Sequence, residues 1–310
     1  MKHLVLTPCS RRKRAHIEPA LRASALKPAR LSQVAEAWAS RLGRSWNKVA
    51  AEELYAGRGL VEARRAANAV GGELRIVSAG LGLVDCREAV PAYSLTVTGG
   101  DPDSIAAKVQ GAFSAELWWK ALHAALGMPQ GALQDLILRR DGLIILALPG
   151  TYLALIAGEL ANLPPDLLSR VRLVGPPKEM VRRELASIWM PYDARFDGDD
   201  SPNPGTRGDF AQRAARHFAE IVLRAAPNAD TIDHAEMVTE YLRPLPLRAP
   251  VRREAGTDAE LMDVIRELLP KARGRSGETL RLLRRDAGRA CEQGRFRRLF
   301  AAATGEDLVQ

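Results

Sequence analysis

Hydrophobic positions in this sequence form short runs separated by longer stretches with helical spacing. Four runs of β-branched residues and leucine, each bounded by turn residues, are typical of strands buried on both faces. They cover Leu4–Thr7, Leu74–Ser78, Leu143–Ala147 and Val171–Val174. Helical spacing predicts helices over Leu31–Leu42, Ala50–Ala69, Ile105–Leu126 and Tyr152–Leu163. This alternation predicts an α/β fold with a parallel sheet of about four strands and helices on both faces.

The pattern changes after residue 190, so we expect an α/β domain over 1–190, a connecting region over 191–250 and a small all-helical domain over 251–310. Within the connecting region, Tyr192–Gly208 predicts a polar loop, Asp209–Ala225 a helix and Leu242–Val251 a proline-rich linker. The last domain is expected to hold three helices. They run from a cap at Thr257 or Asp258 to Leu269, from a cap at Ser276 or Thr279 to Asp286, and over Cys291–Ala303.

Charge is concentrated near the end of the chain. The 310 residues carry a net charge of +8. Between Lys271 and Arg298 ten lysines and arginines face three carboxylates, so this stretch holds +7 of the excess. Such a concentration is typical of a protein that binds phosphate backbones, and the expected partner is nucleic acid, specifically double-stranded DNA. The alternative is a solvated surface in a protein that uses arginine throughout.

Two short helices joined by a turn at Ala287-Gly288-Arg289, with basic residues on the second, are typical of a helix-turn-helix. The last helix would turn Phe296, Leu299, Phe300 and Ala303 inward. The side chains expected to reach DNA are Arg284, Arg285, Gln293, Arg295, Arg297 and Arg298. The alternative is a helical lid over the α/β domain.

The apolar runs are too short to span a bilayer, which needs about 20 residues. The basic run Arg11–Arg14 follows the first apolar stretch, which is not the order of a signal peptide. Three distant cysteines suit a reducing compartment and have no zinc-binding spacing. We therefore expect a cytoplasmic protein without membrane contact, and no metal or cofactor.

The loops after the predicted strands carry a family resemblance. Thr7-Pro8-Cys9-Ser10-Arg11-Arg12-Lys13 resembles the PCSxxK motif of archaeosine synthase. Related bacterial domains continue with a Leu-Tyr element, a Ser-Ala-x-x-Gly-Leu strand end and a Pro-x-Tyr-x-Leu segment. These are matched here by Glu53–Arg58, Ser78–Asp85 and Pro91–Thr96. The peroxide-stress protein YaaA family is similar over the same region, and Leu148–Tyr152 loosely matches a later loop of that family.

This resemblance covers roughly residues 1–180 and implies handling of nucleobases or nucleic acid, including 7-deazaguanine modification. Arg14-Ala15 stands where the archaeosine synthase motif continues with Pro-Tyr, so lysine transfer is not implied. The sheet also resembles that of uracil-DNA glycosylases. Their Gly-Gln-Asp-Pro-Tyr and His-Pro-Ser loops are missing, so their particular chemistry is not carried over.

Each residue in these loops has a chemical and a structural interpretation. Cys9 is a candidate nucleophile beside basic residues that would lower a thiol pKa, or a small residue packed at a strand end. Tyr93 and Tyr152 are candidates to stack on an extruded base, or core residues. Arg58 is a candidate phosphate ligand, or half of a surface ion pair. The residues expected to bind a base or phosphate are Ser10, Lys13, Tyr55, Arg58, Ser78, Gly80, Tyr93, Gly150, Thr151 and Tyr152.

Cleavage of a glycosidic bond creates an oxocarbenium-like centre that carboxylates stabilise. Asp85, directly after a strand-end loop, is the first candidate and Glu53 the second; either could instead pair with Arg87 or Arg58.

The preferred hypothesis is a DNA-binding N-glycosylase that flips a modified base into a strand-end pocket, with a role in phage defence. The alternatives are a 7-deazaguanine-type base-modifying enzyme that uses Cys9 or Lys13, and a non-catalytic DNA-binding stress protein. An open pocket faced by Asp85 would favour the enzymes. A pocket filled by Tyr93 and Tyr152 would favour the binding protein.

Overall fold

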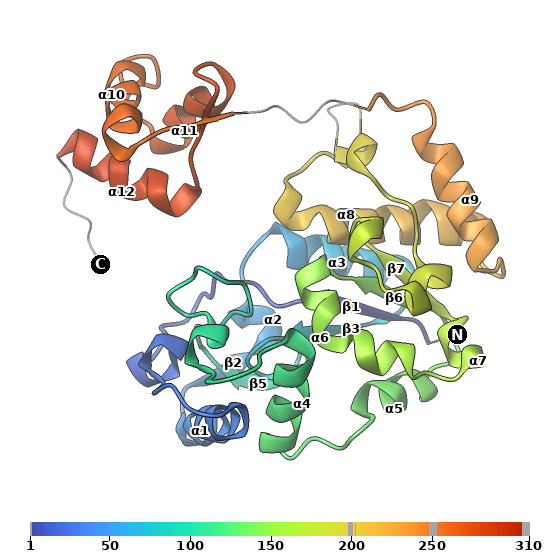
Figure 1. The fold of residues 1–310 in the computed structure, drawn as a ribbon. Helices are drawn as coiled ribbons and strands as arrows, with labels where there is room; N and C mark the ends of the chain where they lie inside the picture. The colour runs from blue at the N-terminus through green and yellow to red at the C-terminus, as the bar shows by residue number, and fades with distance from the viewer. Residues whose placement is uncertain (1, 198–200, 202, 248–252, 306–310) are drawn as a thin grey trace. The chain divides into compact units, whose positions relative to one another are not determined.

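A five-stranded sheet lies at the centre of the larger part of the chain, with strand order β4-β3-β1-β6-β7 (Figure 1). Its parallel strands are β1 (Leu4–Pro8), β3 (Glu73–Ser78), β6 (Ile144–Ala147) and β7 (Val171–Val174). They agree within one residue with the four predicted strands, so the α/β prediction is confirmed. The fifth strand, β4 (Gly82–Asp85), runs antiparallel to β3 and was not predicted.

This computed structural model describes residues 2–197, 201, 203–247 and 253–305. The chain divides into two compact units, Met1–Arg248 and Ala249–Gln310. Residues 191–247, which we expected to connect two domains, therefore belong to the first unit. The predicted linker Leu242–Val251 lies partly outside the described residues. No helix in the described ranges is long and apolar enough to cross a membrane.

Helices cover both faces of the sheet because successive strand side chains point to opposite sides. Leu4 and Leu6 belong to one buried cluster, whereas Val5 belongs to the other. Full burial of such a side chain contributes about 1.5–3 kcal/mol. The first cluster includes side chains of α1 (Leu31–Arg44), α2 (Ala51–Leu54), α4 (Ala115–Ala125), α5 (Ala132–Leu138), α6 (Gly150–Ala161) and α7 (Pro165–Leu168).

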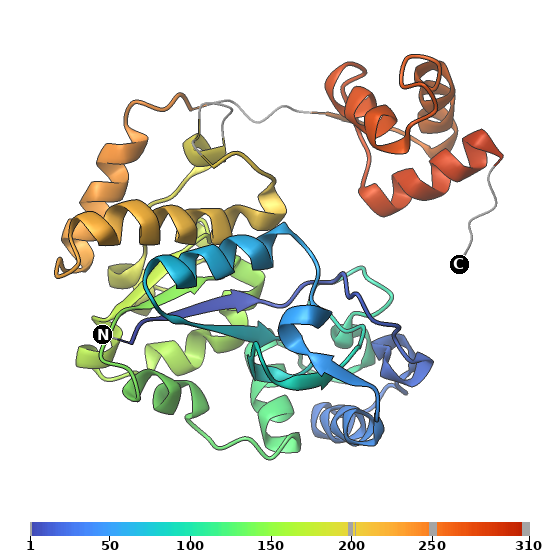
Figure 2. The ribbon, with the colours of Figure 1, turned by 180° about the vertical axis from the view of Figure 1, so that it is seen from behind.

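The opposite face is covered by elements from distant parts of the chain. They are α3 (Arg58–Ala69), α8 (Phe210–His217), its π-helical continuation Phe218–Leu223 and α9 (Thr231–Leu242). Figure 2 shows α3 and α8 side by side across the strands. Two short strands, β2 (Lys48–Ala50) and β5 (Ala89–Pro91), form a separate antiparallel pair.

The second unit holds α10 (Asp258–Leu268), α11 (Ser276–Arg285) and α12 (Gln293–Thr304) around its own apolar cluster. Thr257 caps α10 by accepting the Glu260 N–H, as predicted. The expectation of purely helical structure is wrong. The two-residue strands β8 (Glu254–Ala255) and β9 (Arg289–Ala290) pair in parallel. This pairing joins the segment before α10 to the segment before α12.

Two buried histidines make the first unit sensitive to acid. Burial lowers the pKa of His123 and of His217 to about 4, from 6.5. The unfolded chain therefore takes up protons that the folded chain rejects, and stability falls as the pH drops from 6.5 towards 4.

We expect each histidine to cost on the order of 2 kcal/mol of unfolding free energy at about pH 5. Denaturant unfolding followed by tryptophan emission checks this, because all five tryptophans precede residue 190. His123→Gln and His217→Gln should each flatten the pH dependence, and an unchanged profile in both variants would contradict the assignment.

Candidate active site

Six polar side chains from five separate segments meet where the parallel strands end. Cys9 follows β1, Ser78 ends β3, Tyr93 follows β5 and Tyr152 lies in the first turn of α6. Tyr55 and Lys13 join them, and the strand-end cluster is the group of Cys9, Lys13, Tyr55, Ser78, Tyr93 and Tyr152. In doubly wound sheets ligands bind at this edge. The segments that carry the family resemblance thus converge in space, although they are scattered along the sequence.

Hydrogen bonds connect the members of the cluster. The Tyr93 hydroxyl lies 2.6 Å from Ser78 Oγ and 3.1 Å from the Tyr55 hydroxyl. Cys9 Sγ lies 3.1 Å from the Tyr152 hydroxyl. Lys13 Nζ lies 4.2 Å from the centre of the Tyr93 ring. Tyr55, Ser78 and Tyr93 are fully buried, whereas Lys13 and Tyr152 are half-buried, so Lys13 and Tyr152 border the solvent.

Backbone pairing fixes the loop that carries Cys9 and Lys13. Lys13 forms an antiparallel bridge with Tyr55. The Arg14 N–H donates to the Leu54 carbonyl at 2.9 Å, and the Ala56 N–H donates to the Arg12 carbonyl at 3.0 Å. These bonds require the chain between α2 and α3 to be extended. The single helix predicted over Ala50–Ala69 is therefore interrupted at Tyr55–Gly57.

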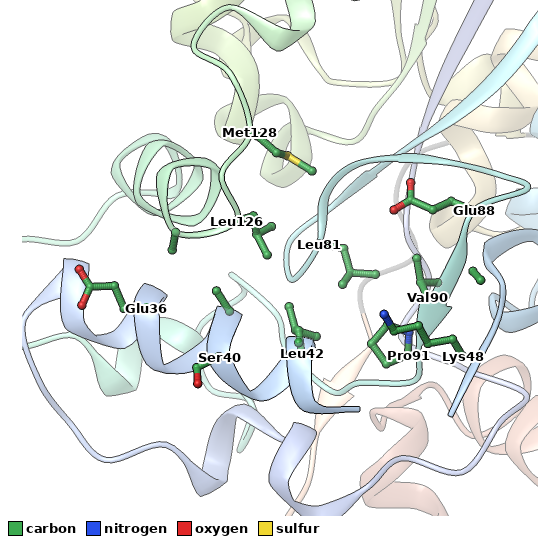
Figure 3. A pocket seen from close by; sticks show the side chains of 14 residues that line it. Glu36, Ser40, Leu42, Lys48, Leu81, Glu88, Val90, Pro91, Leu126 and Met128 are labelled. Atoms are coloured by element: carbon green, nitrogen blue, oxygen red, sulfur yellow. The ribbon is translucent and has the colours of Figure 1, made fainter. Parts of the chain in front are cut away.

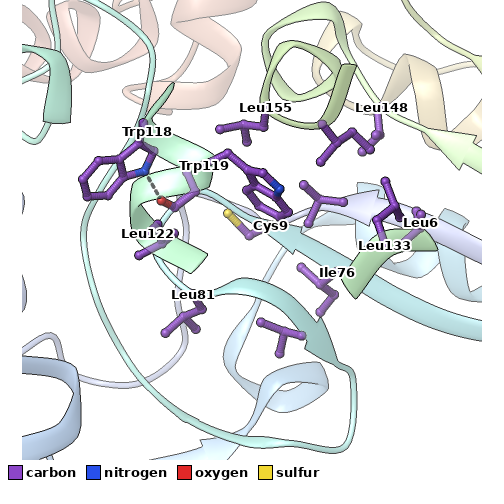
Figure 4. Close-up of a cluster of buried hydrophobic side chains, with 14 of the residues drawn as sticks. Leu6, Cys9, Ile76, Leu81, Trp118, Trp119, Leu122, Leu133, Leu148 and Leu155 are labelled. Atoms are coloured by element: carbon purple, nitrogen blue, oxygen red, sulfur yellow. Dashed lines mark hydrogen bonds between the residues drawn. The ribbon is translucent and has the colours of Figure 1, made fainter. Parts of the chain in front are cut away.

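The turn between β3 and β4 forms the floor of the cluster. Ser78 Oγ accepts the Leu81 N–H at 3.0 Å. Two buried tryptophans bind the backbone of this turn. The Trp38 indole donates to the Gly80 carbonyl. The Trp118 indole donates to the Ala79 carbonyl, and Figure 4 draws this second bond. Neither tryptophan was predicted, because a tryptophan on a helix normally indicates only core packing.

Glycine is required at position 80 because the Tyr93 ring lies close to it, and not because of its backbone conformation. A Cβ at this position would lie 2.6 Å from Tyr93 Cε2. The positive φ of the turn, +74°, belongs to Gly82 instead.

We expect Gly80→Ala to push the Tyr93 ring off Ser78 and to destabilise the first unit by about 1–3 kcal/mol. Denaturant midpoints measure this change. Gly99→Ala is the matched control, because a Cβ there meets no atom within 4 Å. Equal midpoints for the two variants would contradict the packing described.

The cluster contains three phenols that stay protonated and one amine that ionises less readily than usual. Burial raises the pKa of Tyr55, Tyr93 and Tyr152 well above that of free tyrosine. Burial also lowers the pKa of Lys13, an effect that the charge of Cys9 partly offsets. The tyrosines can therefore donate hydrogen bonds at neutral pH, and Lys13 is the member best suited to accept a proton.

Cys9 has an apolar side and a polar side. Figure 4 shows it among the buried side chains of the first cluster, near Trp119, and it is 7% exposed. On the polar side it contacts the Tyr152 hydroxyl, and its charge acts on Lys13. The geometry therefore allows thiol chemistry only with Lys13 and Tyr152 as partners.

Asp85 does not face the cluster, and its predicted position is wrong. The turn after Ser78 spans only three residues, and β4 then runs back antiparallel to β3, which pairs Asp85 with Arg75. The Asp85 carboxylate lies 3.0 Å from the Arg75 guanidinium. It therefore lies towards the opposite end of β3 from Ser78. The second candidate, Glu53, is exposed on α2 and makes no hydrogen bond or ion pair with another described residue.

Several other predicted ligands have structural partners. Arg58 pairs with Asp209 at 2.9 Å, as the ion-pair alternative expected. The Ser10 hydroxyl donates to the Arg12 carbonyl, within its own loop. Gly150 is buried beneath Met180, and only Thr151 beside it is exposed.

Tyr93 cannot stack on a base in this arrangement. Lys13 covers its ring, and the rings of Trp38 and Tyr55 pack against it edge-on at 6.0 and 6.5 Å between centroids. Tyr152 differs from Tyr55 and Tyr93 because it is only half-buried, so it is the tyrosine of the cluster that borders the solvent.

The residues expected to bind DNA in the second unit differ in availability. Arg295 bonds to Asp258 and to the Gly256 carbonyl, and Arg284 donates to the Cys291 carbonyl at 2.8 Å. Arg285 pairs with Asp286. Gln293, Arg297 and Arg298 are exposed on α12, whose buried face contains Phe296, Leu299 and Phe300 as predicted.

No three His, Cys, Asp or Glu side chains in the described part of the chain lie together as a metal site would require. The strand-end cluster combines a thiol, an amine, three phenols and the Ser78 hydroxyl, groups that suit nucleophilic and proton-transfer chemistry. Comparisons with protein-family models, curated proteins and solved structures gave no match to this chain.

Proposed function

We propose that this protein is a nucleic-acid-binding enzyme that modifies a nucleobase through Cys9 at the strand-end cluster. The observation that carries the proposal is the contact of Cys9 Sγ with the Tyr152 hydroxyl at 3.1 Å, beside the partly buried Lys13 amine. The resemblance of this loop to the PCSxxK motif supports a base of the 7-deazaguanine type. The N-glycosylase alternative is weaker, because neither of its expected carboxylates belongs to the cluster.

The chemistry available is addition of a thiol to an electrophilic carbon on the base, such as the carbon of a nitrile. Lys13 accepts the Cys9 proton, and the thiolate forms a carbon–sulfur bond. The electron pair of the attacked multiple bond moves to its nitrogen, which takes the proton back from Lys13. Tyr152 donates a hydrogen bond to the sulfur or to the nitrogen during this transfer. Water then adds to the thioimidate carbon, the carbon–sulfur bond breaks, and the sulfur leaves and is protonated again, so that the base carries a carboxamide and Cys9 is regenerated.

The closed packing of the cluster implies that substrate binding must move a side chain. Lys13 covers the Tyr93 ring, so it is the side chain that must move to admit the substrate. It can move because it is half-buried and has no ion-pair partner among the described residues. A negatively charged or electron-rich group on the substrate would compensate its charge. Without such movement, the packed tyrosines would favour the non-catalytic binding protein.

Incubation of the protein with nucleic acid that carries a nitrile-substituted 7-deazaguanine tests the proposal, with unmodified nucleic acid as the control. Mass analysis of the released nucleosides should show a changed base and an intact strand. Alkali-labile strand breaks would instead support an N-glycosylase. Binding without any product would support the non-catalytic protein.

The second unit is the part that we propose holds the nucleic acid. Arg297 and Arg298 support this, because both are exposed and neither forms an ion pair within the described residues. We expect the Arg297→Ala/Arg298→Ala double variant to weaken binding to every DNA sequence and to flatten the log–log salt dependence by about two units.

Arg281→Ala is the matched control for the double variant, since this exposed arginine is already paired with Glu278. Titrations of labelled duplex DNA at several salt concentrations measure both effects. Unchanged affinity in the double variant would place the nucleic acid elsewhere and leave the second unit as a structural appendage.

A further inference from the structure

One tryptophan of the first unit differs from the others in its exposure. Trp46 lies between α1 and β2 with 88% of its surface exposed, whereas Trp38, Trp118 and Trp119 are completely buried. An indole is a large rigid surface, and Trp is enriched where proteins bind partners. The exposed Trp46 indole is therefore suited to bind a ligand with an aromatic or apolar face.

Strand register places Trp46 on the side of the strand-end cluster. β2 pairs antiparallel to β5, with Lys48 opposite Pro91. Trp46 precedes Lys48 by two residues, and Tyr93 follows Pro91 by two residues. The segments that lead to Trp46 and to Tyr93 therefore leave the Lys48–Pro91 pair in the same direction.

A groove of about 650 Å³ adjoins the segment (Figure 3). Gly43 and Lys48, on either side of Trp46 in the sequence, both line it. Its other walls are mainly aliphatic and include Leu81, which belongs to the turn that forms the floor of the cluster. Leu126 and Met128 face Leu42 and Leu81 across the opening, as Figure 3 shows. The groove is large enough for a planar base and lies behind the same turn.

The charges around the groove fit a base with its phosphates outside. Glu36 and Glu88 line the groove, and their carboxylates can accept N–H groups of a base edge. Exposed Lys48, two residues after Trp46, can contact the backbone, whereas Arg44 already donates to the carbonyl and the hydroxyl of Ser40. Arg41 is not available, because it donates to the carbonyls of Ala20 and Ala25.

We propose that Trp46 and this groove form a second base-binding site, which stacks an unpaired nucleobase next to the one that enters the strand-end cluster. The inference rests on the proposed function in requiring nucleic acid as the ligand. It does not require Cys9 to be reactive, so the two proposals can fail separately. Base stacking on an exposed aromatic is tolerant of sequence, and each stacked base typically contributes about tenfold or more in affinity.

The test uses a single strand of about ten adenine nucleotides, a length within the range of known single-strand sites. Emission of the full-length protein is compared with that of Trp46→Phe, so that the difference isolates Trp46. We expect the strand to quench this difference. Trp46→Ala should bind a dye-labelled strand about tenfold more weakly, while Trp46→Phe, which keeps a ring, should lose less.

Ile232→Ala is the control, because Ile232 is an apolar side chain on α9 that is 67% exposed. A strand that binds without quenching Trp46, and with equal affinity for Trp46→Ala, would overturn the inference and leave the proposed function standing. Failure of the wild-type protein to bind any nucleic acid would overturn both. If Trp46→Ala instead abolished self-association in sedimentation, the surface would be a protein contact and the inference would be wrong.

Discussion

Replacing Cys9 with alanine is expected to lower turnover of the modified base by about 10³-fold or more, because the only thiol in the strand-end cluster is then lost. Nucleic-acid affinity should remain, since the exposed arginines of α12 are unchanged. The fold should also survive. The variant removes one sulfur from a well-packed site, a change that costs about 1 kcal/mol. Single-turnover kinetics and duplex binding of the same preparation separate these effects.

Asp85→Asn is the matched control for this prediction. Its carboxylate pairs with Arg75 away from the cluster, so we expect activity close to that of the wild type. A Cys9→Ala protein with full activity would remove thiol chemistry from the account. If Asp85→Asn lost activity at the same time, a carboxylate mechanism would replace it.

Replacing Arg213 with alanine is expected to destabilise the first unit by about 3–5 kcal/mol, the usual cost of breaking a buried ion pair from one side. Arg213 is 1% exposed and donates to Asp209 at 2.8 Å and to Asp197. It also donates to the carbonyls of Asn203 and Thr206. Its removal leaves these acceptors without their main donor.

Tryptophan emission during denaturant unfolding measures this loss without interference from the second unit, which contains no tryptophan. Arg224→Ala is the control, because Arg224 is exposed just after the π-helical continuation of α8. A loss below about 1 kcal/mol for Arg213→Ala would mean that the network contributes no more than surface pairs do.

The parallel strands could be predicted because each is an apolar run short enough to be a strand and bounded by turn residues. β4 could not, because its sequence Gly-Leu-Val-Asp reads equally well as the rest of a loop. That single omission misplaced Asp85, since a hairpin returns the chain to the opposite end of the sheet. The prediction for Asp85 therefore failed because this residue lies beyond the turn, on a strand that runs back along β3.

The domain boundary at residue 190 was misplaced for a different reason. The region after it is polar and rich in Asp, Pro and Gly, which is typical of a loop. Its packing depends on a few widely spaced residues: Tyr192, Phe196, Phe218 and Val238 are buried against the second face of the sheet. The charges of Arg213 and Asp209 add to the polar character of the sequence, although the structure buries both. Composition alone cannot distinguish a buried ion pair from a solvated one.

The interpretation of single arginines depends on contacts that sequence does not contain. Arg295 and Arg297 lie two positions apart on α12 and were predicted to act alike. The structure turns the first towards Asp258 and leaves the second exposed. Helical position separates inward from outward faces, but it does not show which outward side chains already have a partner.

In the proposed reaction Cys9 bonds covalently to a base. The most direct measurement is the mass of the intact protein, and of its Cys9 peptide, after a denaturing quench of the reaction with nitrile-bearing 7-deazaguanine nucleic acid. We expect an adduct on Cys9 that appears before product and is absent from Cys9→Ala. Turnover by the wild type with no adduct at any time, or an adduct on another residue, would contradict it.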